Sequence, residues 1–324
     1  MTARIHGGPD AAGAAAHDFS TNANAAGPCP IALAAVRDAD RARYPDPAST
    51  RVRAALAAFH GVTAGRVLPA ASASEFIFRI TAWAARQGVR QVELPPHAYG
   101  DYGAAARAWG LAAGEEAGLV WACEPSSPLG QQERSLRERI AGGATVVLDR
   151  AYEPLRLAGA ASLDRAGLDR VWQLWSPNKA LGLTGVRGAY AIAPAAAAAA
   201  AAQLQALAPS WPLGADGQAM LLAWCEPAVQ QWLEASRAML RDWKARQLAL
   251  CRELGWTLQA SQANFLVASH PLLPTALDRL RRRGVQLRDC ASFGLPGRVR
   301  LSVQPPAAQD ALAAAWRELA GAFR

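Results

Sequence analysis

The chain has 324 residues, of which 52% are hydrophobic, and this length accommodates one large domain and a smaller one. Its net charge is +8, but the basic residues are scattered, which argues against nucleic-acid binding and favours a site for an anionic small molecule. The five cysteines are odd in number and no pair has CxxC spacing, which argues against a disulfide framework and against a metal site.

The N-terminal residues 1–30 are rich in Gly, Ala, Asn and Pro and have no clear periodicity, so they predict an extended arm. The first positions lack the apolar core of a signal peptide. The longest weakly apolar run, the alanines from Ala195 to Ala202, is too short to span a bilayer. We therefore expect a cytoplasmic protein that does not contact a membrane.

The next part of the chain alternates between helical and strand-like patterns. Residues 32–61 are mostly helical, with a break at Tyr44-Pro-Asp-Pro47, and helical stretches also separate several of the strands that follow. This alternation predicts an α/β fold with a parallel or mixed sheet between helices. The expected buried strands are Val67–Pro69, Gln91–Leu94, Leu119–Cys123, Thr145–Leu148, Val171–Trp175 and Ala189–Ile192.

The C-terminal third predicts a smaller α/β unit. Pro194 and the alanines after it predict a helix with the proline in its first turn. Residues 215–254 predict one long helix or two, which bridge to the smaller unit. Its expected strands are Asn264–Ala268, Val285–Arg288 and Val299–Val303, and its expected last helix is Ala307–Phe323.

Polar residues follow five of the expected strands. Ligands of open α/β sheets bind outside the carboxyl ends of the strands, so these residues together predict a site. Ser72 and Glu75 also fit a capping box, and the free N–H groups of a helix start suit a phosphate; an ordinary capped helix is the alternative. The five segments are Ser72–Glu75, His97–Tyr99, Glu124–Ser127, Asp149–Tyr152 and Ser176–Lys179.

Lys179 is the only lysine before Asp242, in a chain that uses arginine almost everywhere else. A lysine amine can lose its proton and form an imine, whereas a guanidinium stays protonated. An isolated lysine therefore indicates imine chemistry, with a chance surface lysine as the alternative.

The segment from Ser176 to Tyr190, SPNKALGLTGVRGAY, resembles the lysine segment of the fold type I aminotransferase family. Its closest branch contains histidinol-phosphate aminotransferases and threonine-phosphate decarboxylases. The resemblance implies a fold type I transferase with a mostly parallel mixed sheet. It also implies pyridoxal 5'-phosphate as cofactor, held by Lys179 as a Schiff base, with Ser176 and Arg187 at the cofactor phosphate.

Other segments extend the resemblance to the remaining cofactor contacts. The implied role of Asp149 is to pair with the ring nitrogen, because a protonated ring is the electron sink that stabilises a carbanion at Cα. Tyr152 is implied to bond the ring hydroxyl and Tyr99 to stack on the ring. The backbone of Ala73 and Ser74 would contact the phosphate. On this basis the chain divides into the arm (1–30), a large cofactor-binding domain (31–212) and a small C-terminal domain (213–324) that starts with a bridging helix.

The resemblance also implies a partner subunit and a substrate contact. Tyr44 matches a tyrosine that reaches the cofactor phosphate of the neighbouring subunit, which implies a homodimer with shared sites. Arg300 matches the arginine that grips the substrate carboxylate with a bidentate fork. The chain departs from the family at Ser127, where an asparagine normally bonds the ring hydroxyl, and at Ser72, where a glycine is usual.

The two ends of the chain resemble the threonine-phosphate decarboxylase branch. The His6-Gly-Gly start, Asn22 and the Arg288-Asp-Cys segment carry this resemblance and imply that His6, Asn22 and Arg288 lie near the substrate. We expect decarboxylation of L-threonine O-3-phosphate to (R)-1-aminopropan-2-yl phosphate in cobalamin biosynthesis. The alternatives are an aminotransferase of the histidinol-phosphate type and a catalytically weak cofactor-binding protein.

Overall fold

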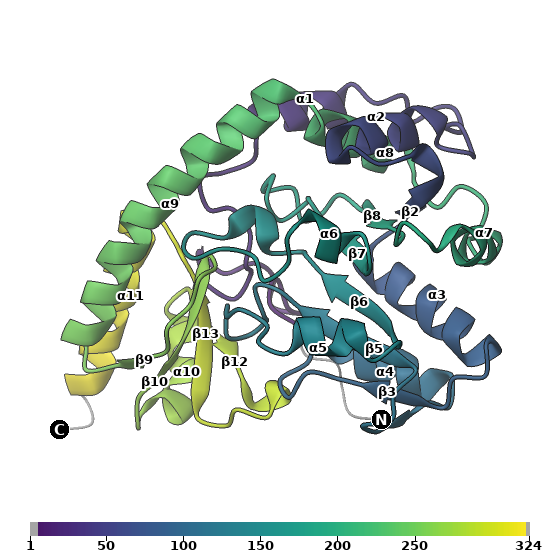
Figure 1. Cartoon of the computed structure of the whole chain (residues 1–324). Helices are drawn as coiled ribbons and strands as arrows, with labels where there is room; N and C mark the ends of the chain where they lie inside the picture. The colour runs from purple at the N-terminus through teal and green to yellow at the C-terminus, as the bar shows by residue number, and fades with distance from the viewer. Residues whose placement is uncertain (1–5, 322–324) are drawn as a thin grey trace.

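The computed structural model describes residues 6–321. Its largest sheet has seven strands in the order β2-β8-β7-β6-β5-β3-β4 (Figure 1). Only β8 runs antiparallel to its neighbours, so the sheet is mixed and mostly parallel, as expected for the fold class. The strands are β2 (Val67–Ala70), β3 (Gln91–Glu93), β4 (Ala112–Ala113), β5 (Leu119–Cys123), β6 (Thr145–Asp149), β7 (Trp172–Trp175) and β8 (Ala189–Ile192).

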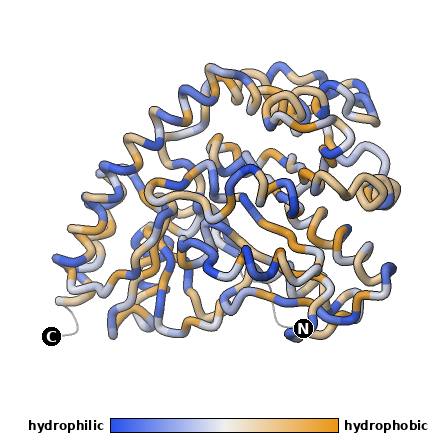
Figure 2. The backbone as a smooth tube through the Cα atoms, in the orientation of Figure 1, coloured by the Kyte–Doolittle hydropathy of each residue, from blue (hydrophilic) through white to orange (hydrophobic). Residues whose placement is uncertain are grey.

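Helices cover both faces of this sheet, and alternate side chains of each central strand therefore enter different cores. Leu119 and Trp121 of β5 join the core beneath α3 and α4, whereas Val120 and Ala122 join the core beside Leu136 of α5. Figure 2 shows hydrophobic and hydrophilic segments alternating along the backbone. The covering helices are α3 (Ala73–Arg86), α4 (Gly100–Ala108), α5 (Leu136–Ala141), α6 (Arg165–Leu168) and α7 (Ala198–Ala206), and short 3-10 turns lie at η1 (Ala64–Arg66) and η2 (Glu153–Leu155).

The structure confirms the six strands expected in this region and corrects the start of α7. The edge strand β4 was not expected, because its two exposed alanines have no apolar pattern. We expected Pro194 in the first turn of the alanine helix, but α7 begins at Ala198. Pro194 instead accepts a hydrogen bond from the backbone N–H of Ala197 (3.1 Å), so it closes a turn ahead of the helix.

A layer of three helices packs on one face of the large sheet, over β2, β8 and β7, and leads into a long bridge. The layer contains α1 (Pro30–Arg37), α2 (Thr50–His60) and α8 (Ala215–Trp224), and the break between α1 and α2 falls where it was expected. Residues 215–254 form two helices, because α9 (Pro227–Glu253) restarts at Pro227. Figure 1 shows α9 running from this layer to the C-terminal sheet, where α11 (Pro306–Gly321) packs along it. The last positions of the expected final helix lie outside the described residues.

The C-terminal sheet has four antiparallel strands in the order β12-β13-β10-β9. One expected strand, 285–288, is split: β11 (Val285–Gln286) pairs in parallel with β1 (His17–Asp18) of the N-terminal arm, and only the next strand joins the main sheet. The arm is thus extended but tied down, and Phe19 is fully buried in the C-terminal core. The other elements are β9 (Thr257–Leu258), β10 (Phe265–Ser269), α10 (Leu273–Arg282), β12 (Arg288–Asp289), η3 (Ala291–Phe293) and β13 (Arg298–Ser302).

All five cysteines are free thiols, and four of them are buried. Among residues 6–321, none of the helices combines the length and the apolar character needed to cross a bilayer.

Candidate active site

A cavity of about 780 Å³ lies at the carboxyl ends of β2, β5, β6 and β7 and is bordered by the N-terminal arm and the C-terminal sheet. All the predicted site residues except Tyr44 line it. Those that do are His6, Asn22, Ala73, Ser74, Tyr99, Ser127, Asp149, Tyr152, Ser176, Lys179, Arg187, Arg288 and Arg300.

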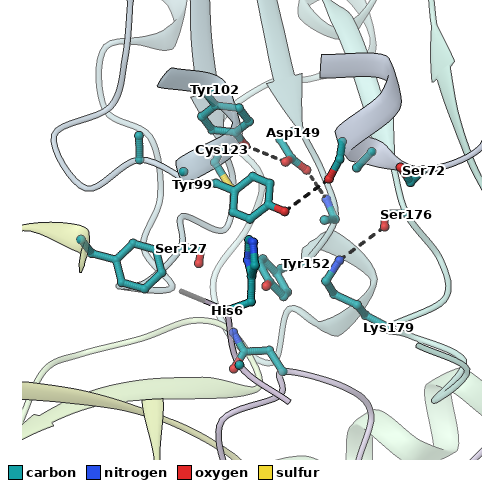
Figure 3. A pocket seen from close by; sticks show the side chains of 18 of the residues that line it. His6, Ser72, Tyr99, Tyr102, Cys123, Ser127, Asp149, Tyr152, Ser176 and Lys179 are labelled. Atoms are coloured by element: carbon teal, nitrogen blue, oxygen red, sulfur yellow. Dashed lines mark hydrogen bonds between the residues drawn. The ribbon is translucent and has the colours of Figure 1, made fainter. Parts of the chain in front are cut away.

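Lys179 follows β7 and is half-buried at the wall of the cavity (Figure 3). Its Nζ donates a hydrogen bond to Ser176 Oγ (3.4 Å) and lies 5.5 Å from the centroid of the Tyr152 ring. The chain has only one other lysine, Lys244, which is buried in α9 and donates to two backbone carbonyl groups. Lys179 is therefore the only lysine whose amine faces the cavity.

Asp149 ends β6 and is 6% exposed. Its Oδ2 accepts a hydrogen bond from the Tyr102 hydroxyl (2.6 Å), and its Oδ1 accepts one from the backbone N–H of Ala151 (2.9 Å). Burial raises the pKa of Asp149, while these two hydrogen bonds and the charge of Lys179 act in the opposite direction. No described basic side chain forms an ion pair with Asp149, so the buried carboxylate suits a cationic group in the cavity.

The opposite end of the cavity suits a phosphate. The Ser72 side chain caps α3 by accepting a hydrogen bond from the Glu75 N–H (3.1 Å), so the free N–H groups of the first turn border the cavity. The second half of the expected capping box differs, because the Glu75 carboxylate pairs with Arg79 (3.0 Å). Arg187 lines the same cavity and forms no ion pair within the part of the chain that the structure describes.

Tyr99 provides an aromatic wall between these two ends. Its hydroxyl lies 3.3 Å from Ser74 Oγ, and its ring is 5.9 Å from the His6 ring and 5.7 Å from the Tyr102 ring, centroid to centroid. Burial raises the pKa of Tyr99, so its phenol stays neutral at ordinary pH. Figure 3 shows the Tyr99 ring and the Lys179 amine bordering the same space.

Two arginines close the side formed by the C-terminal sheet. Arg288 of β12 and Arg300 of β13 are directly opposite in the antiparallel pairing, and both are buried. Arg300 donates to Ser127 Oγ (3.1 Å) and to the Ser20 carbonyl (3.0 Å), while Arg288 donates to Ser292 Oγ (2.7 Å). Burial, followed by the charge of Arg300, lowers the pKa of Arg288. Like charges placed opposite each other repel, so this pair suits a bound anion.

Two further buried groups point to a ligand. The side-chain amide nitrogen and oxygen of Asn22 are both buried, and neither has a hydrogen-bond partner among the described residues. The same holds for the Nε of Arg300. Buried polar atoms normally have partners, so these atoms fit a polar molecule that completes the site. Asp149, which has no ion pair among the described residues, and the N-terminus of α3 add to this picture. Together these groups fit pyridoxal phosphate and an anionic substrate.

The sequence did not identify every residue of the site. Tyr102 bonds Asp149, and its position one helical turn after Tyr99 was the signal that could have found it. Cys123 and Asn178 also line the cavity, and each lies close in sequence to a residue that was identified. Ser127, which stands where the family's asparagine normally bonds the ring hydroxyl, accepts a hydrogen bond from Arg300.

Tyr44 is the one predicted site residue that lies outside the cavity. It is 82% exposed, and its ring stacks on Trp211 with a centroid distance of 4.6 Å. The Trp211 indole donates to the Pro45 carbonyl (3.0 Å), which fixes this aromatic pair on the surface. Within one chain, Tyr44 has no access to the cavity.

Comparisons with known proteins agree with this architecture. The family model described as aminotransferase class I and II matches residues 111–315. Histidinol-phosphate aminotransferase 2 of Burkholderia mallei is 30% identical over 94% of this chain and 92% of its own length. Histidinol-phosphate aminotransferase from Sinorhizobium meliloti, solved in complex with pyridoxal-5'-phosphate, has a TM-score of 0.77 at 22% identity and covers 94% of this chain and 90% of its own. L-threonine-O-3-phosphate decarboxylase from Porphyromonas gingivalis has a TM-score of 0.71 at 19% identity, with coverages of 89% and 92%.

Proposed function

Because the chain belongs to the class I and II aminotransferase family, which depends on pyridoxal phosphate, we propose that it is an enzyme acting on a small amino compound that carries a phosphate. The observation that carries the proposal is one cavity that joins Lys179 and Asp149 to the opposed pair Arg288 and Arg300. The first two residues serve the cofactor, and the arginines serve an anionic group of the substrate.

We propose one orientation for the cofactor in the cavity. The first turn of α3, with Arg187 and Ser176, would hold its phosphate, and Asp149 would hold its protonated ring nitrogen. Tyr99 would cover one face of the ring, and Tyr152 would bond the ring hydroxyl. When bound, pyridoxal phosphate supplies an electron sink that stabilises negative charge at the Cα of an amino substrate.

Lys179 would act as the covalent anchor and as a base. Its amine faces the cavity beside Ser176 Oγ, which accepts a hydrogen bond from it. An amine released from the cofactor at this place can take a proton from the substrate Cα and return it, which is general base and acid catalysis. Arg300 would hold the substrate anion with its donors, and Asn22 would supply its unpartnered amide to the same molecule.

The curated relatives make aminotransfer the first candidate reaction. Histidinol-phosphate aminotransferases align over 88–94% of the chain at 27–30% identity, for example those of Burkholderia mallei and Symbiobacterium thermophilum. Aminotransfer uses two substrates one after the other. A phosphorylated amino alcohol brings its phosphate into the cavity, and the amino acid that exchanges the amino group brings its carboxylates. The pair Arg288 and Arg300 suits either anion.

Decarboxylation of threonine phosphate is the second candidate, and the N-terminal arm favours it. The arm brings His6 to the ring of Tyr99 and brings the unpartnered Asn22 into the same cavity. These two residues belong to the segment that resembles the decarboxylase branch. Threonine phosphate carries a carboxylate and a phosphate together, and the arm provides polar groups in addition to the arginine pair.

One experiment separates the two reactions. The purified holoenzyme is incubated with histidinol phosphate or threonine phosphate, with and without 2-oxoglutarate, and carbon dioxide, glutamate and the amine product are measured. Glutamate formed only with 2-oxoglutarate supports aminotransfer, and carbon dioxide released without it supports decarboxylation. Lys179→Ala is the control, and turnover that persists in it would contradict the role of Lys179. Bound cofactor with no turnover of any phosphorylated amine would instead support the binding-protein alternative.

We also propose that the enzyme is a homodimer whose sites are shared, with Tyr44 serving the cavity of the neighbouring subunit. The support is the surface position of Tyr44, because a large aromatic side chain that is 82% exposed in one chain suits a contact with another chain. Mixed dimers of Tyr44→Ala and Lys179→Ala subunits contain one complete site if Tyr44 acts across the interface. We expect such mixtures to recover up to about half of the wild-type kcat, as subunit exchange assays can measure. Activity that stays at the level of Tyr44→Ala would exclude sharing.

A further inference from the structure

Tyr102 lies in the cavity wall without any role in the function proposed above. It belongs to α4, is completely buried, and donates its hydroxyl to Asp149 Oδ2 at 2.6 Å (Figure 3). Its ring is fixed on both sides: it stacks on Trp121 of β5 at 4.4 Å with planes 8° apart, and it meets the edge of Tyr99 at 5.7 Å. These ring contacts therefore hold the Tyr102 hydroxyl so that it points at the Asp149 carboxylate.

We infer that Tyr102 is a positioning residue that orients the Asp149 carboxylate and keeps it ionised for the cofactor ring nitrogen. This inference rests on the proposed role of Asp149. The Tyr102 hydroxyl occupies one oxygen and the Ala151 N–H occupies the other, so the carboxylate cannot rotate without losing a hydrogen bond. Its remaining lone pairs are left for a donor in the cavity.

The surroundings of Asp149 make this hydrogen bond important. Burial favours the neutral acid, and few groups oppose it. Cys123 faces the carboxylate from β5, but burial raises the pKa of its thiol well above the ordinary value, so the thiol stays neutral and adds no charge beside Asp149. Lys179 is the one nearby cation whose charge favours the ionised form. Burial also raises the pKa of Tyr102, which therefore remains a donor throughout the working range.

A second buried tyrosine provides a matched comparison. Tyr190 of β8 is also fully buried and its hydroxyl is also paired, with His60 Nε2 (2.8 Å) and the Trp224 indole (3.1 Å). Tyr190 does not line the cavity and has no carboxylate partner among these contacts. Loss of its hydroxyl tests the structural cost of removing a buried phenol O–H without touching Asp149.

The experiment measures the affinity of the apoenzyme for pyridoxal phosphate as a function of pH. In Tyr102→Phe the ring packing remains and only the hydroxyl is lost. Without this donor the pKa of Asp149 rises, so cofactor affinity starts to fall at a higher pH as the solution is acidified. We expect this acid limb of the affinity profile to move up by about one pH unit. At pH values well below the wild-type midpoint, the variant should therefore bind the cofactor about tenfold more weakly.

The controls separate this inference from the proposed function. Tyr190→Phe is expected to lower the melting temperature but to leave the acid limb unchanged. Asp149→Asn is expected to remove the limb, and a limb that survives it would overturn the role of Asp149 itself. A limb that disappears in Asp149→Asn but does not move in Tyr102→Phe would overturn only the inference. If Tyr102→Phe does not fold, Tyr102→His retains a ring N–H donor and should keep the limb at or below its wild-type pH; a higher position would overturn the inference.

Discussion

Arg288 and Arg300 are placed directly opposite each other on neighbouring strands, in a position where water cannot fully screen their charges. Such a pair is costly when no anion lies between the guanidinium groups, because two buried cations repel. The cost falls when a phosphate or carboxylate binds. At the scale of the residue, this opposed pair therefore favours a bound anion, in line with the role proposed for it in binding the substrate.

We expect Arg300→Gln to reduce kcat/KM by at least about 2 kcal/mol of transition-state binding, roughly 30-fold, because a buried charge contact is lost. Cofactor affinity should change little, since Arg300 contacts Ser127 and the Ser20 carbonyl rather than Asp149. Steady-state kinetics and a cofactor titration measure both effects. Arg283→Gln, which removes an exposed arginine paired with Glu318, is the control and should change kcat/KM less than twofold. Equal losses in the two variants would contradict the assignment.

Single residues with distinctive chemistry at strand ends were predictable. Lys179 was identified because its residue type is rare in this chain, and Asp149 because a carboxylate directly follows a buried strand. The hydrogen bond from Tyr102 and the opposition of Arg288 and Arg300 were not predictable. They depend on how two elements pair in space, and sequence spacing does not contain that information.

At the scale of the element, α9 connects the two sheets through one buried lysine. Lys244 donates to the carbonyls of Ser261 (2.6 Å) and Ala263 (2.7 Å), in the loop between β9 and β10. The same loop reaches the segments that follow β5 and η2, because the Gln262 N–H donates to the Gly130 carbonyl and the Gln262 carbonyl accepts from the Leu157 N–H, at 2.6 Å each. One ammonium therefore holds the loop that spans the junction beside the cavity.

This lysine predicts a pH dependence of stability. Burial lowers the pKa of Lys244 from 10.5 to about 8. Between these values the unfolded chain keeps a proton that the folded chain has released, so the free energy of unfolding rises with pH. The full increment is about 3 kcal/mol and is complete above pH 10.5; below pH 8 the folded state bears the cost of a buried charge. Urea unfolding of the wild type and of Lys244→Met, at pH values across this range, should show the increment only in the wild type. A parallel pH dependence in both would exclude Lys244 as its source.

The predictions agree with the structure where neighbouring residues alone determine the element, as in β5, β8 and the break before α2. The expected strand 285–288 is wrong as a single strand, because its first half pairs with residues more than 250 positions earlier in the chain. The start of α7 is wrong because alanine favours a helix equally at every position of the run and gives no sign of where it begins.

At the scale of the whole molecule, the N-terminal arm joins both sheets and the cavity. Phe19 is buried in the C-terminal core and its carbonyl accepts from the Ser302 N–H (2.8 Å), while the Asn24 N–H donates to the carbonyl of Lys179 (2.9 Å). We propose that the chain divides into the arm (1–30), a large domain (31–212) and a small domain (213–324). The arm then contacts both the core of the small domain and the backbone of Lys179.

We expect Phe19→Ala to lower the free energy of unfolding by about 3–5 kcal/mol, the usual cost of emptying a buried phenylalanine site. It should also raise the KM for the substrate, because Asn22 is displaced when the arm loses its anchor. Denaturant unfolding and steady-state kinetics measure the two effects. Phe59→Ala, which removes a partly exposed ring outside the cavity, is the matched control, with a loss of about 1 kcal/mol and an unchanged KM. A KM unaffected by Phe19→Ala would separate the arm from substrate binding.

The scarcity of lysine has a practical consequence for anyone who handles this protein. Of the 34 basic residues other than histidine, only Lys179 and Lys244 carry primary amines, and Lys244 is enclosed in α9 with its donors engaged. Amine-directed labels, cross-linkers and coupling resins therefore find the α-amino group and the cavity lysine and little else. Reductive trapping with the cofactor should mark one position per chain, so the stoichiometry of labelling counts intact sites directly. For the same reason, attachment to an amine-reactive surface would compete with the function of the enzyme, and a thiol or a tag is the better handle.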